Sequence, residues 1–272
     1  MSTDLMNEPL SGCSGVLVND IDLARLDDVA IARIRDAFAR HSVLLFRAQS
    51  LCPSSQIEFT RLFGSCEPHP LASHRGPPEH PELLIVEHRP GVRSRRNDVW
   101  HSDVSFSPQP PLVTVLHAIE VPAHRGDTLI CNLVTACERL SPAFRHALEG
   151  LEAVHDAGPE VRQVHAQARG HEDLTAPEPT RHPVIWKLPD CEQETLYVNP
   201  YYVSHFVGMT AEESRPLLDT LFDIALRPEH IYRHRWQRGD VLLWDNRRTM
   251  HYAIRDYDDD TLRVMHRTTA NP

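Results

Sequence analysis

Two histidines and one aspartate carry the strongest chemical signal in this sequence. His101 and Asp103 are two residues apart, and His251 follows much later in the chain. In an extended segment, residues i and i+2 point to the same face, so the first two side chains can reach one metal ion. An imidazole and a carboxylate at this spacing suit a borderline cation such as Fe(II), Zn(II) or Mn(II).

A third ligand is needed to complete a metal site. A lone His-x-Asp triplet is weak evidence, because the chain holds 18 histidines and chance matches are expected. His251, however, follows a strand and a tight turn at Asp245-Asn246. Two histidines and one carboxylate form the facial triad of non-haem Fe(II) oxygenases, which leaves positions open for a co-substrate and oxygen. The six cysteines form no Cys-x-x-Cys pair, which excludes a cysteine-rich structural zinc site.

A pair of arginines beyond His251 could bind an anion. Arg263 and Arg267 are four residues apart, so they share one face of a strand. A guanidinium binds a carboxylate through two parallel hydrogen bonds, and a buried arginine would therefore act as a carboxylate clamp. The alternative is that both arginines lie on the surface and pair with the acidic run 258–260.

The elements that must position these residues are mostly strands. Alternating or continuous apolar segments predict strands over 15–18, 42–46, 83–86, 112–119, 127–132, 184–186, 195–198, 233–236, 240–244 and 263–268. Helical periodicity and capping residues predict helices over 22–40, 54–63, 141–151 and 210–227, the second capped by Ser54 or Ser55 and the third by Ser141. Short strands broken by turns indicate a sandwich or barrel with helices outside, in one domain over 1–272.

Two long segments lack such patterns. Residues 64–99 are rich in proline and should be irregular apart from the one strand. Residues 156–182 are polar and charged, which indicates a loop or lid. Three histidines in or beside this lid are expected to be in solvent: His165, His171 and His182.

Composition excludes several classes of function. The chain has 28 Lys and Arg against 38 Asp and Glu, a net charge of −10, which argues against a nucleic-acid partner. No apolar run reaches the ~20 residues of a membrane helix, so no membrane partner is expected. Residues 1–9 hold two acidic side chains and no basic-then-apolar signal, and we expect a cytoplasmic location.

In order along the chain, these motifs resemble a known family. The matching pieces are Trp100-His101-Ser102-Asp103, then Gly126-Asp127-Thr128, then Leu196-Tyr197-Val198-Asn199, then Trp244-Asp245-Asn246 with His251, and finally Arg263 with Arg267. Together they resemble the taurine and phenoxyacetate dioxygenase family of Fe(II)- and 2-oxoglutarate-dependent oxygenases. The resemblance covers nearly the whole chain.

The resemblance implies a fold and a site. The fold would be a double-stranded β-helix, a jelly-roll core of the cupin type, mostly β with flanking helices. Fe(II) would be bound by His101, Asp103 and His251. Arg263, assisted by Thr128, would hold the distal carboxylate of 2-oxoglutarate. With O2, the co-substrate would be split to succinate and CO2 while a substrate C–H is hydroxylated.

The resemblance also implies where a small anionic substrate would bind. The family's anion-binding positions correspond to His69, Asn97, Val104 and Arg267, and Tyr202 keeps an aromatic ring in the wall. Such groups suit a sulfonate, a sulfate ester or a carboxylate such as an aryloxy acid. Two wall positions that are aromatic in taurine-oxidising relatives are Ala72 and Ala157 here, so either the substrate is larger or lid residues fill the space.

Three other interpretations stay open. The same iron chemistry could act on an amino acid or a natural-product intermediate, by hydroxylation, desaturation or cyclisation. The chain could instead be a zinc hydrolase, or a binding protein with a vestigial metal pocket, although the complete triad and both arginines argue against the latter. Family members are commonly homo-oligomers, so the resemblance implies a dimer or tetramer.

Overall fold

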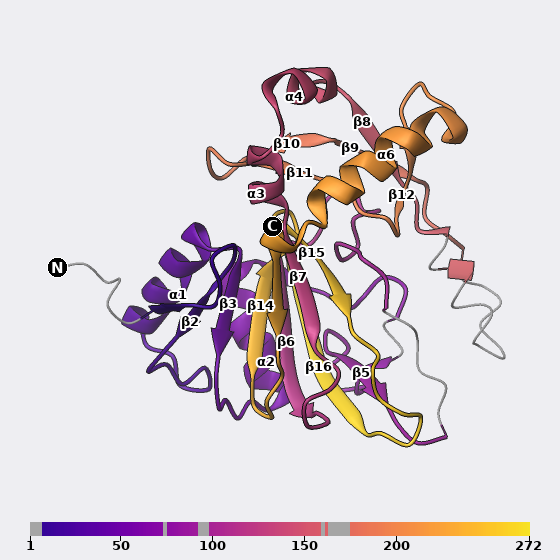
Figure 1. The fold of residues 1–272 in the computed structure, drawn as a ribbon. Coiled ribbons are helices and arrows are strands. Elements are labelled where there is room, and N and C mark those ends of the chain that lie inside the picture. Colours follow the sequence, from indigo (N-terminus) through magenta and orange to yellow (C-terminus); the bar gives the residue numbers. More distant parts are fainter. Residues whose placement is uncertain (1–6, 73–74, 92–97, 159–160, 163–174) are drawn as a thin grey trace.

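Two β-sheets face each other in the computed structural model, which describes residues 7–72, 75–91, 98–158, 161–162 and 175–272. The larger sheet runs in the order β1-β2-β3-β14-β6-β16-β4, with β5 also paired to β16 (Figure 1). Its strands are β1 (Asn7–Pro9), β2 (Val16–Val18), β3 (Val43–Phe46), β4 (Ser65–Cys66), β5 (Leu84–His88), β6 (Val113–Glu120), β14 (Val241–Asp245) and β16 (Arg263–Asn271). The smaller sheet has the order β13-β7-β15 and contains β7 (Thr128–Asn132), β13 (Ile231–His234) and β15 (Thr249–Ala253).

Strand alternation builds the core between the two sheets. Leu45 and Leu242 of the larger sheet pack against Ile130 of the smaller one, in a cluster that also contains Trp236 and Trp244. Their sequence neighbours point the other way and form a separate apolar layer. Because successive side chains of a strand alternate between faces, one run of apolar residues serves both layers.

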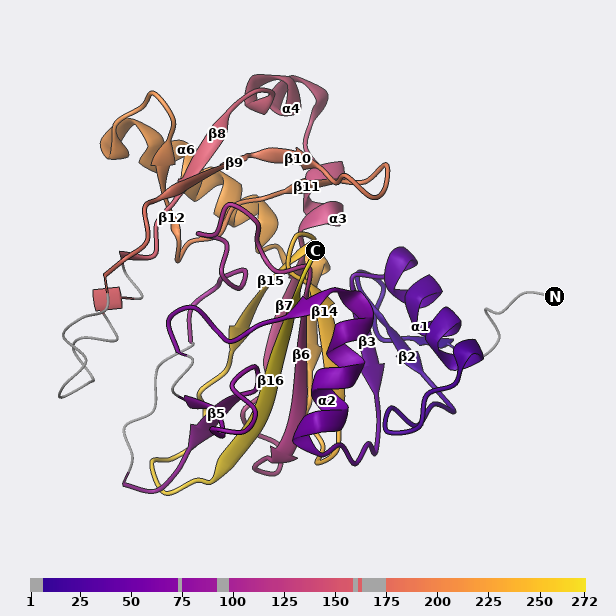
Figure 2. The ribbon, with the colours of Figure 1, turned by 180° about the vertical axis from the view of Figure 1, so that it is seen from behind.

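The outer layer is covered by two helices. Helix α1 (Asp28–Arg40) and helix α2 (Pro53–Thr60), which continues into the 3₁₀ helix η2 (Arg61–Phe63), lie against the outer face of the larger sheet (Figure 2). Ile34 and Phe59 are buried there. The two helices thus seal the face of the sheet that points away from the smaller sheet.

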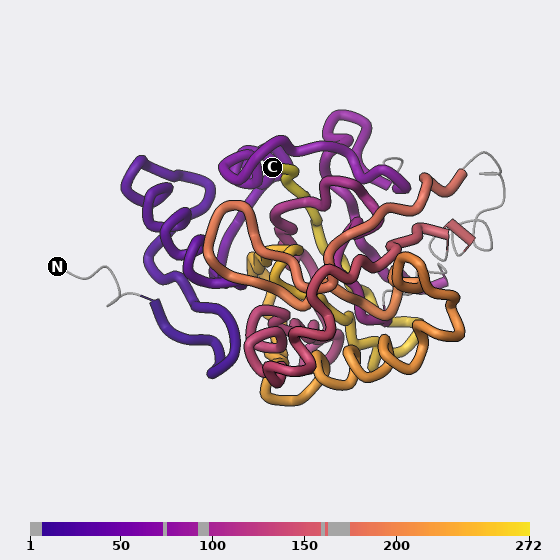
Figure 3. The backbone as a smooth tube through the Cα atoms, turned by 90° about the horizontal axis from the view of Figure 1, so that it is seen from above, coloured from indigo at the N-terminus to yellow at the C-terminus, as the bar shows by residue number. Residues whose placement is uncertain are grey.

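The chain between β7 and β13 forms a third region above one end of the sheets (Figure 1), and in the view from above it lies in front of them (Figure 3). It contains α3 (Leu133–Glu138), α4 (Pro142–Leu148), β8 (Glu152–His155), β9 (Thr180–Pro183), β10 (Ile185–Lys187), β11 (Glu194–Leu196), β12 (Val203–Phe206), α6 (Ala211–Ala225) and the 3₁₀ helix η4 (Pro228–His230). These elements have their own apolar cluster, which includes Leu148, Phe206 and Leu221. This region therefore covers the end of the sheets without interrupting their pairing.

The expected strand-rich core with outer helices is confirmed, but several boundaries were wrong. Helix α1 begins at Asp28 rather than residue 22, since Asp27 accepts a hydrogen bond from the Ala30 amide as its N-cap. Helix α2 starts at Pro53 after Cys52, which makes no side-chain cap, so neither Ser54 nor Ser55 caps it. Ser141 does cap α4.

Other elements lie where no strand or helix was expected. They are β1, β4, α3, β8, β9, β12, η4 and β15, the strand that carries His251. The region proposed as a lid, 156–182, ends in β9, which pairs with β8, and part of it lies outside the described residues. Among the residues that the structure describes, no helix has the length and apolar character needed to span a membrane.

Candidate metal and co-substrate site

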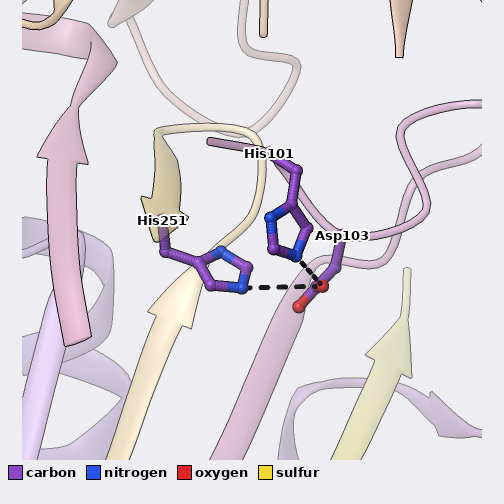
Figure 4. A group of neighbouring side chains, drawn as sticks. All are labelled: His101, Asp103 and His251. Atoms are coloured by element: carbon purple, nitrogen blue, oxygen red, sulfur yellow. Dashed lines mark ion pairs between the residues drawn. The ribbon is translucent and has the colours of Figure 1, made fainter. Parts of the chain in front are cut away.

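The three side chains singled out first meet at one buried point. Nε2 of His101 lies 3.6 Å from Oδ1 of Asp103, and Nε2 of His251 lies 3.7 Å from the same oxygen (Figure 4). One donor atom from each residue falls within 4.8 Å of the others. All three residues are buried, so the donors face one another away from bulk water.

Backbone hydrogen bonds hold the two histidines together. The His101 amide donates to the His251 carbonyl over 3.1 Å, and the His251 amide donates to the His101 carbonyl over 2.8 Å. This isolated antiparallel bridge joins the loop that carries His101 to strand β15. The opposite edge of β15 pairs with β7, where Ile130 faces His251. At His251, strand β15 is thus held by the His101 segment on one edge and by β7 on the other.

The hydrogen bonding of His101 and the protonation of His251 suit metal ligands. His101 Nδ1 donates to the Val99 carbonyl over 2.8 Å, so Nε2 is the ring atom that faces Asp103. Burial, together with the neighbouring His101, lowers the pKa of His251 to about 3, although Asp103 acts in the opposite direction. His251 is therefore a neutral imidazole at ordinary pH. Its Nδ1 has no hydrogen-bond partner among the described residues.

Asp103 is held by a chain of buried hydrogen bonds. Thr114 donates its hydroxyl to Asp103 Oδ2 over 2.7 Å, Asn246 Nδ2 donates to that hydroxyl over 2.9 Å, and Trp244 Nε1 donates to Asn246 Oδ1 over 3.1 Å. Burial alone would raise the pKa of Asp103, but Arg267, His251 and His101 hold it well below its usual range. The carboxylate is therefore ionised and oriented.

The turn before His251 is braced by charges that the sequence analysis did not identify. Buried Arg247 donates to both oxygens of Asp245 and makes a two-point contact with Asp190 at 3.1 and 2.9 Å. Arg248 also pairs with Asp245, at 3.3 Å, and donates to the Ala39 carbonyl at the end of α1. The sequence Asp245-Asn246-Arg247-Arg248 could have indicated these ion pairs, because one carboxylate lies beside two arginines in it.

Arg263 is buried and has spare hydrogen-bonding capacity. Its Nη2 donates to the Gly126 carbonyl at 3.4 Å, while its Nε has no partner among the described residues. Burial lowers the pKa of its guanidinium, with Tyr257 acting in the opposite direction. The alternative of a surface arginine paired with the acidic run is therefore wrong. Asp258 and Asp259 pair with other arginines instead, Arg125 and Arg255.

Thr128 lies on the interior of the smaller sheet, near Arg263. It is opposite Ala253 on β15, two residues from the position opposite His251, so it shares a face with His251. Arg263 lies against Gly126, two residues before Thr128, where an added Cβ would come within 3.1 Å of its Nε. The structure thus brings the two residues expected to bind the co-substrate to the same end of β7.

The other arginine reaches the metal-binding side chains. Arg267 Nη2 lies 3.2 Å from Asp103 Oδ1, and its side chain is 12% exposed. Beside it, Val104, Tyr202 and Phe106 belong to one buried apolar cluster, which is completed by Leu71, Ala157 and Val161. The rings of His101 and Tyr202 are 6.5 Å apart. Three of the expected substrate residues, Val104, Tyr202 and Arg267, therefore surround the metal site.

Two further residues expected to bind the substrate are His69 and Asn97. His69 is partly buried, and its Nδ1 accepts the Leu71 amide at 3.2 Å. Asn97 lies outside the described residues. Ala72 and Ala157 are buried, at 1% and 0% exposure, and Ala157 packs in one cluster with Leu71 and Val161. That cluster also contains Val104 and Tyr202, so Ala157 lies among residues expected at the substrate wall.

One expectation about the lid histidines was wrong. His182 is buried, and its Nε2 lies 3.0 Å from the carbonyls of both Ser105 and Ser107. Burial lowers its pKa, and the ring packs edge-on against His155. His182 therefore supports the loop that follows Asp103 rather than facing solvent. His165 and His171 lie outside the described residues.

The donor set fits a divalent transition metal. Two imidazole nitrogens and one ionised carboxylate oxygen lie within 4.8 Å of one another, and this is the ligand set of facial non-haem iron sites. The hydrogen bonds of His101 and Asp103 fix which atoms face the centre. Unpartnered Arg263 Nε supplies a cationic donor for the carboxylate of a co-substrate.

Comparison with known proteins agrees with this geometry. The family model described as "Taurine catabolism dioxygenase TauD, TfdA family" matches residues 7–269. The chain belongs to the TauD/TfdA family. As a member, it is a dioxygenase, and the predicted fold and family are confirmed.

Individual relatives of this TauD/TfdA chain include an alkylsulfatase of Acinetobacter baylyi, which is 32% identical over 96% of this chain and 83% of its own length. The 2,4-dichlorophenoxyacetate dioxygenase of Cupriavidus pinatubonensis is 30% identical over 96% of both chains. Among solved structures, a taurine dioxygenase from Burkholderia xenovorans matches with a TM-score of 0.83 and 33% identity over 97% of this chain and 88% of that one.

A structure of AAD-2 with Mn(II) and N-oxalylglycine matches with a TM-score of 0.84 and 25% identity over 97% of each chain. N-Oxalylglycine replaces one CH2 of 2-oxoglutarate by NH. Together with the α-ketoglutarate dependence in the relatives' names and the His-Asp-His group, this confirms the predicted use of Fe(II), 2-oxoglutarate and O2.

Proposed function

We propose that this dioxygenase hydroxylates a C–H bond of a small anionic organic substrate while converting 2-oxoglutarate to succinate and CO2. One observation carries the proposal: a buried His101–Asp103–His251 group lies with two interior arginines, and Arg263 Nε has no hydrogen-bond partner among the described residues. The substrate class is a sulfonate, a sulfate ester or a carboxylate such as an aryloxy acid. The alkylsulfatase and dichlorophenoxyacetate relatives support that class, and neither favours the amino-acid alternative.

In this proposal, His101, Asp103 and His251 hold the iron, which, once loaded with the co-substrate, supplies the oxidant for C–H cleavage. Asp103 would offer one oxygen to the metal, while its other oxygen accepts the Thr114 hydroxyl, which restrains rotation of the carboxylate. Arg263 and Thr128 bind the distal carboxylate of 2-oxoglutarate and thereby orient its keto-acid end. The apolar core around Ile130 and Trp244 excludes water from this side of the site.

Arg267 would bind the anionic group of the substrate, assisted by His69 and Asn97, while Val104 and Tyr202 line the wall. Its present contact with Asp103 supports this role, because that contact puts a cation beside the metal and next to an apolar cluster. A substrate anion would share Arg267 with Asp103.

The size of the substrate can be tested at Ala72. This residue is buried near Leu71, so Ala72→Tyr should exclude the longer or bulkier members of a substrate series. Val29→Ala, at a surface position of α1, is a matched control. An unchanged kcat/KM profile across a chain-length series would contradict the assignment of Ala72 to the substrate wall.

The reaction itself is tested by following succinate from 2-oxoglutarate with sulfonates, sulfate esters, aryloxy acids and amino acids. Turnover must require both iron and oxygen, whereas a zinc hydrolase or a binding protein would form no succinate. Asp103→Ala should abolish metal binding and turnover together. Full activity of that variant would refute the metal assignment.

The remaining parts of the proposal concern the whole protein. We propose one domain over 1–272, a homo-oligomer (dimer or tetramer) and a cytoplasmic location. The single domain is supported by β16, which pairs with β4, β5 and β6 and so ties the end of the chain to its first half. Light scattering on the purified protein tests the oligomer, and fractionation of the source cells tests the location.

A further inference from the structure

The hydroxyl of Thr128 is constrained by a residue that has no assigned role. Trp236 Nε1 lies 2.9 Å from Thr128 Oγ1, and both residues are buried. An indole N–H is a donor and never an acceptor, so the threonine oxygen must accept this bond. Among the described residues, the hydroxyl of Thr128 makes no other hydrogen bond. Its hydrogen is therefore left for an acceptor that the described part of the chain does not provide.

Trp236 is in turn held by a buried polar group. The ring of His234 meets the ring of Trp236 edge-on, with centroids 4.4 Å apart. His234 Nε2 lies 3.1 Å from Asp240 Oδ2, and its Nδ1 lies 2.9 Å from the hydroxyl of Tyr232. Burial lowers the pKa of His234 although Asp240 acts in the opposite direction, so the ring is neutral.

The hydrogen bonds of this group have a single consistent direction. A carboxylate can only accept, so Nε2–H of His234 donates to Asp240, and Nδ1 accepts the Tyr232 hydroxyl. Arg47 pairs with the same oxygen of Asp240 at 2.5 Å. The imidazole cannot flip without losing both contacts. The position of the Trp236 ring, and with it the indole N–H, is therefore set by the fold rather than by the bound co-substrate.

We infer that Trp236 is a positioning residue for the co-substrate: its indole N–H donates to Thr128 Oγ1 and so orients the threonine hydroxyl to donate its hydrogen to the distal carboxylate of 2-oxoglutarate. This inference rests on the proposed roles of Thr128 and Arg263. It is supported by the second unpartnered donor in the same corner, Arg263 Nε. Two N–H or O–H donors without acceptors at one end of β7 match an anion that has two oxygens.

The test measures binding rather than turnover. The protein is loaded with Mn(II), and the Kd for N-oxalylglycine is determined by isothermal titration calorimetry. Thr128→Val removes the donor, and Trp236→Phe removes the indole N–H while keeping a ring against His234. Each single variant should weaken binding about fivefold, which is the value of one ordinary hydrogen bond. Trp186→Phe, in the third region, is the matched control and should leave Kd unchanged.

The double variant distinguishes positioning from packing. If Trp236 acts through Thr128, adding Trp236→Phe to Thr128→Val should cost nothing further, because the hydroxyl that it orients is already gone. Oxalate, which has no distal carboxylate, should bind all four proteins equally. Additive losses, or equal losses for oxalate, would overturn the inference. Failure of the unmodified protein to bind N-oxalylglycine would instead overturn the proposed function.

Discussion

Replacing Thr114 by valine should weaken metal binding without removing any metal ligand. The change is nearly isosteric, but it deletes the hydroxyl that donates to Asp103 Oδ2 over 2.7 Å and accepts from Asn246. A hydrogen bond to a charged group contributes about 1.5–3 kcal/mol, which corresponds to a change of about 10- to 150-fold in Kd. Arg267 still contacts the other oxygen of Asp103, so we expect about 10-fold.

The assay is a Mn(II) titration followed by electron paramagnetic resonance, with urea unfolding of the metal-free proteins in parallel. Thr195→Val is the matched control, because Thr195 is equally buried and its hydroxyl has no hydrogen-bond partner among the described residues. It should leave the Mn(II) Kd unchanged. A Kd for Thr114→Val within twofold of the unmodified protein would refute the argument that this hydroxyl orients Asp103.

Three further changes have defined outcomes. Burial lowers the pKa of His117 to about 4, so the unfolded chain binds more protons than the folded protein between about pH 4 and 6.5. The free energy of unfolding should therefore fall as the pH drops through that window. In urea titrations, His117→Gln should flatten this dependence, whereas His124→Asn, at an exposed position, should not. Arg247→Met should lower the unfolding free energy by about 3–5 kcal/mol in the same assay, since it leaves a buried carboxylate without its main partner; a loss below 1 kcal/mol would contradict this. Gly126→Ala should raise the KM for 2-oxoglutarate, because a Cβ there would come within 3.1 Å of Arg263 Nε and the φ of +71° disfavours alanine. An unchanged KM would argue against the assignment of Arg263 and Thr128 to co-substrate binding.

The metal ligands could be predicted because their signal is local. His101 and Asp103 are separated by the two-residue period of an extended chain, and His251 follows a turn whose residues resemble a known motif. The residues that orient these ligands were harder to predict from the sequence. Thr114 meets Asp103 only because β6 passes beside β14, where Thr114 pairs with Trp244. Such a contact depends on which strands are neighbours, and a single sequence does not specify this.

The errors in the elements have a physical cause as well. Leu23 and Leu26 continue the apolar spacing of α1, but they pack on the same core from a turn, and Asp27 caps the helix after them. The short strands of the third region, such as β8 and β12, contain few alternating residues and are stabilised by their partners. His182 lies in a polar segment, yet pairing of β9 with β8 buries its side chain.

The backbone bridge between residues 101 and 251 has a consequence for how iron is acquired. Closing a loop of about 150 residues costs about 4 kcal/mol of chain entropy. The reciprocal amide–carbonyl contacts are made by the polypeptide itself, so they contribute to this closure without a metal–ligand bond taking part. Less of the binding free energy of an ion would then be needed to draw these distant parts of the chain together.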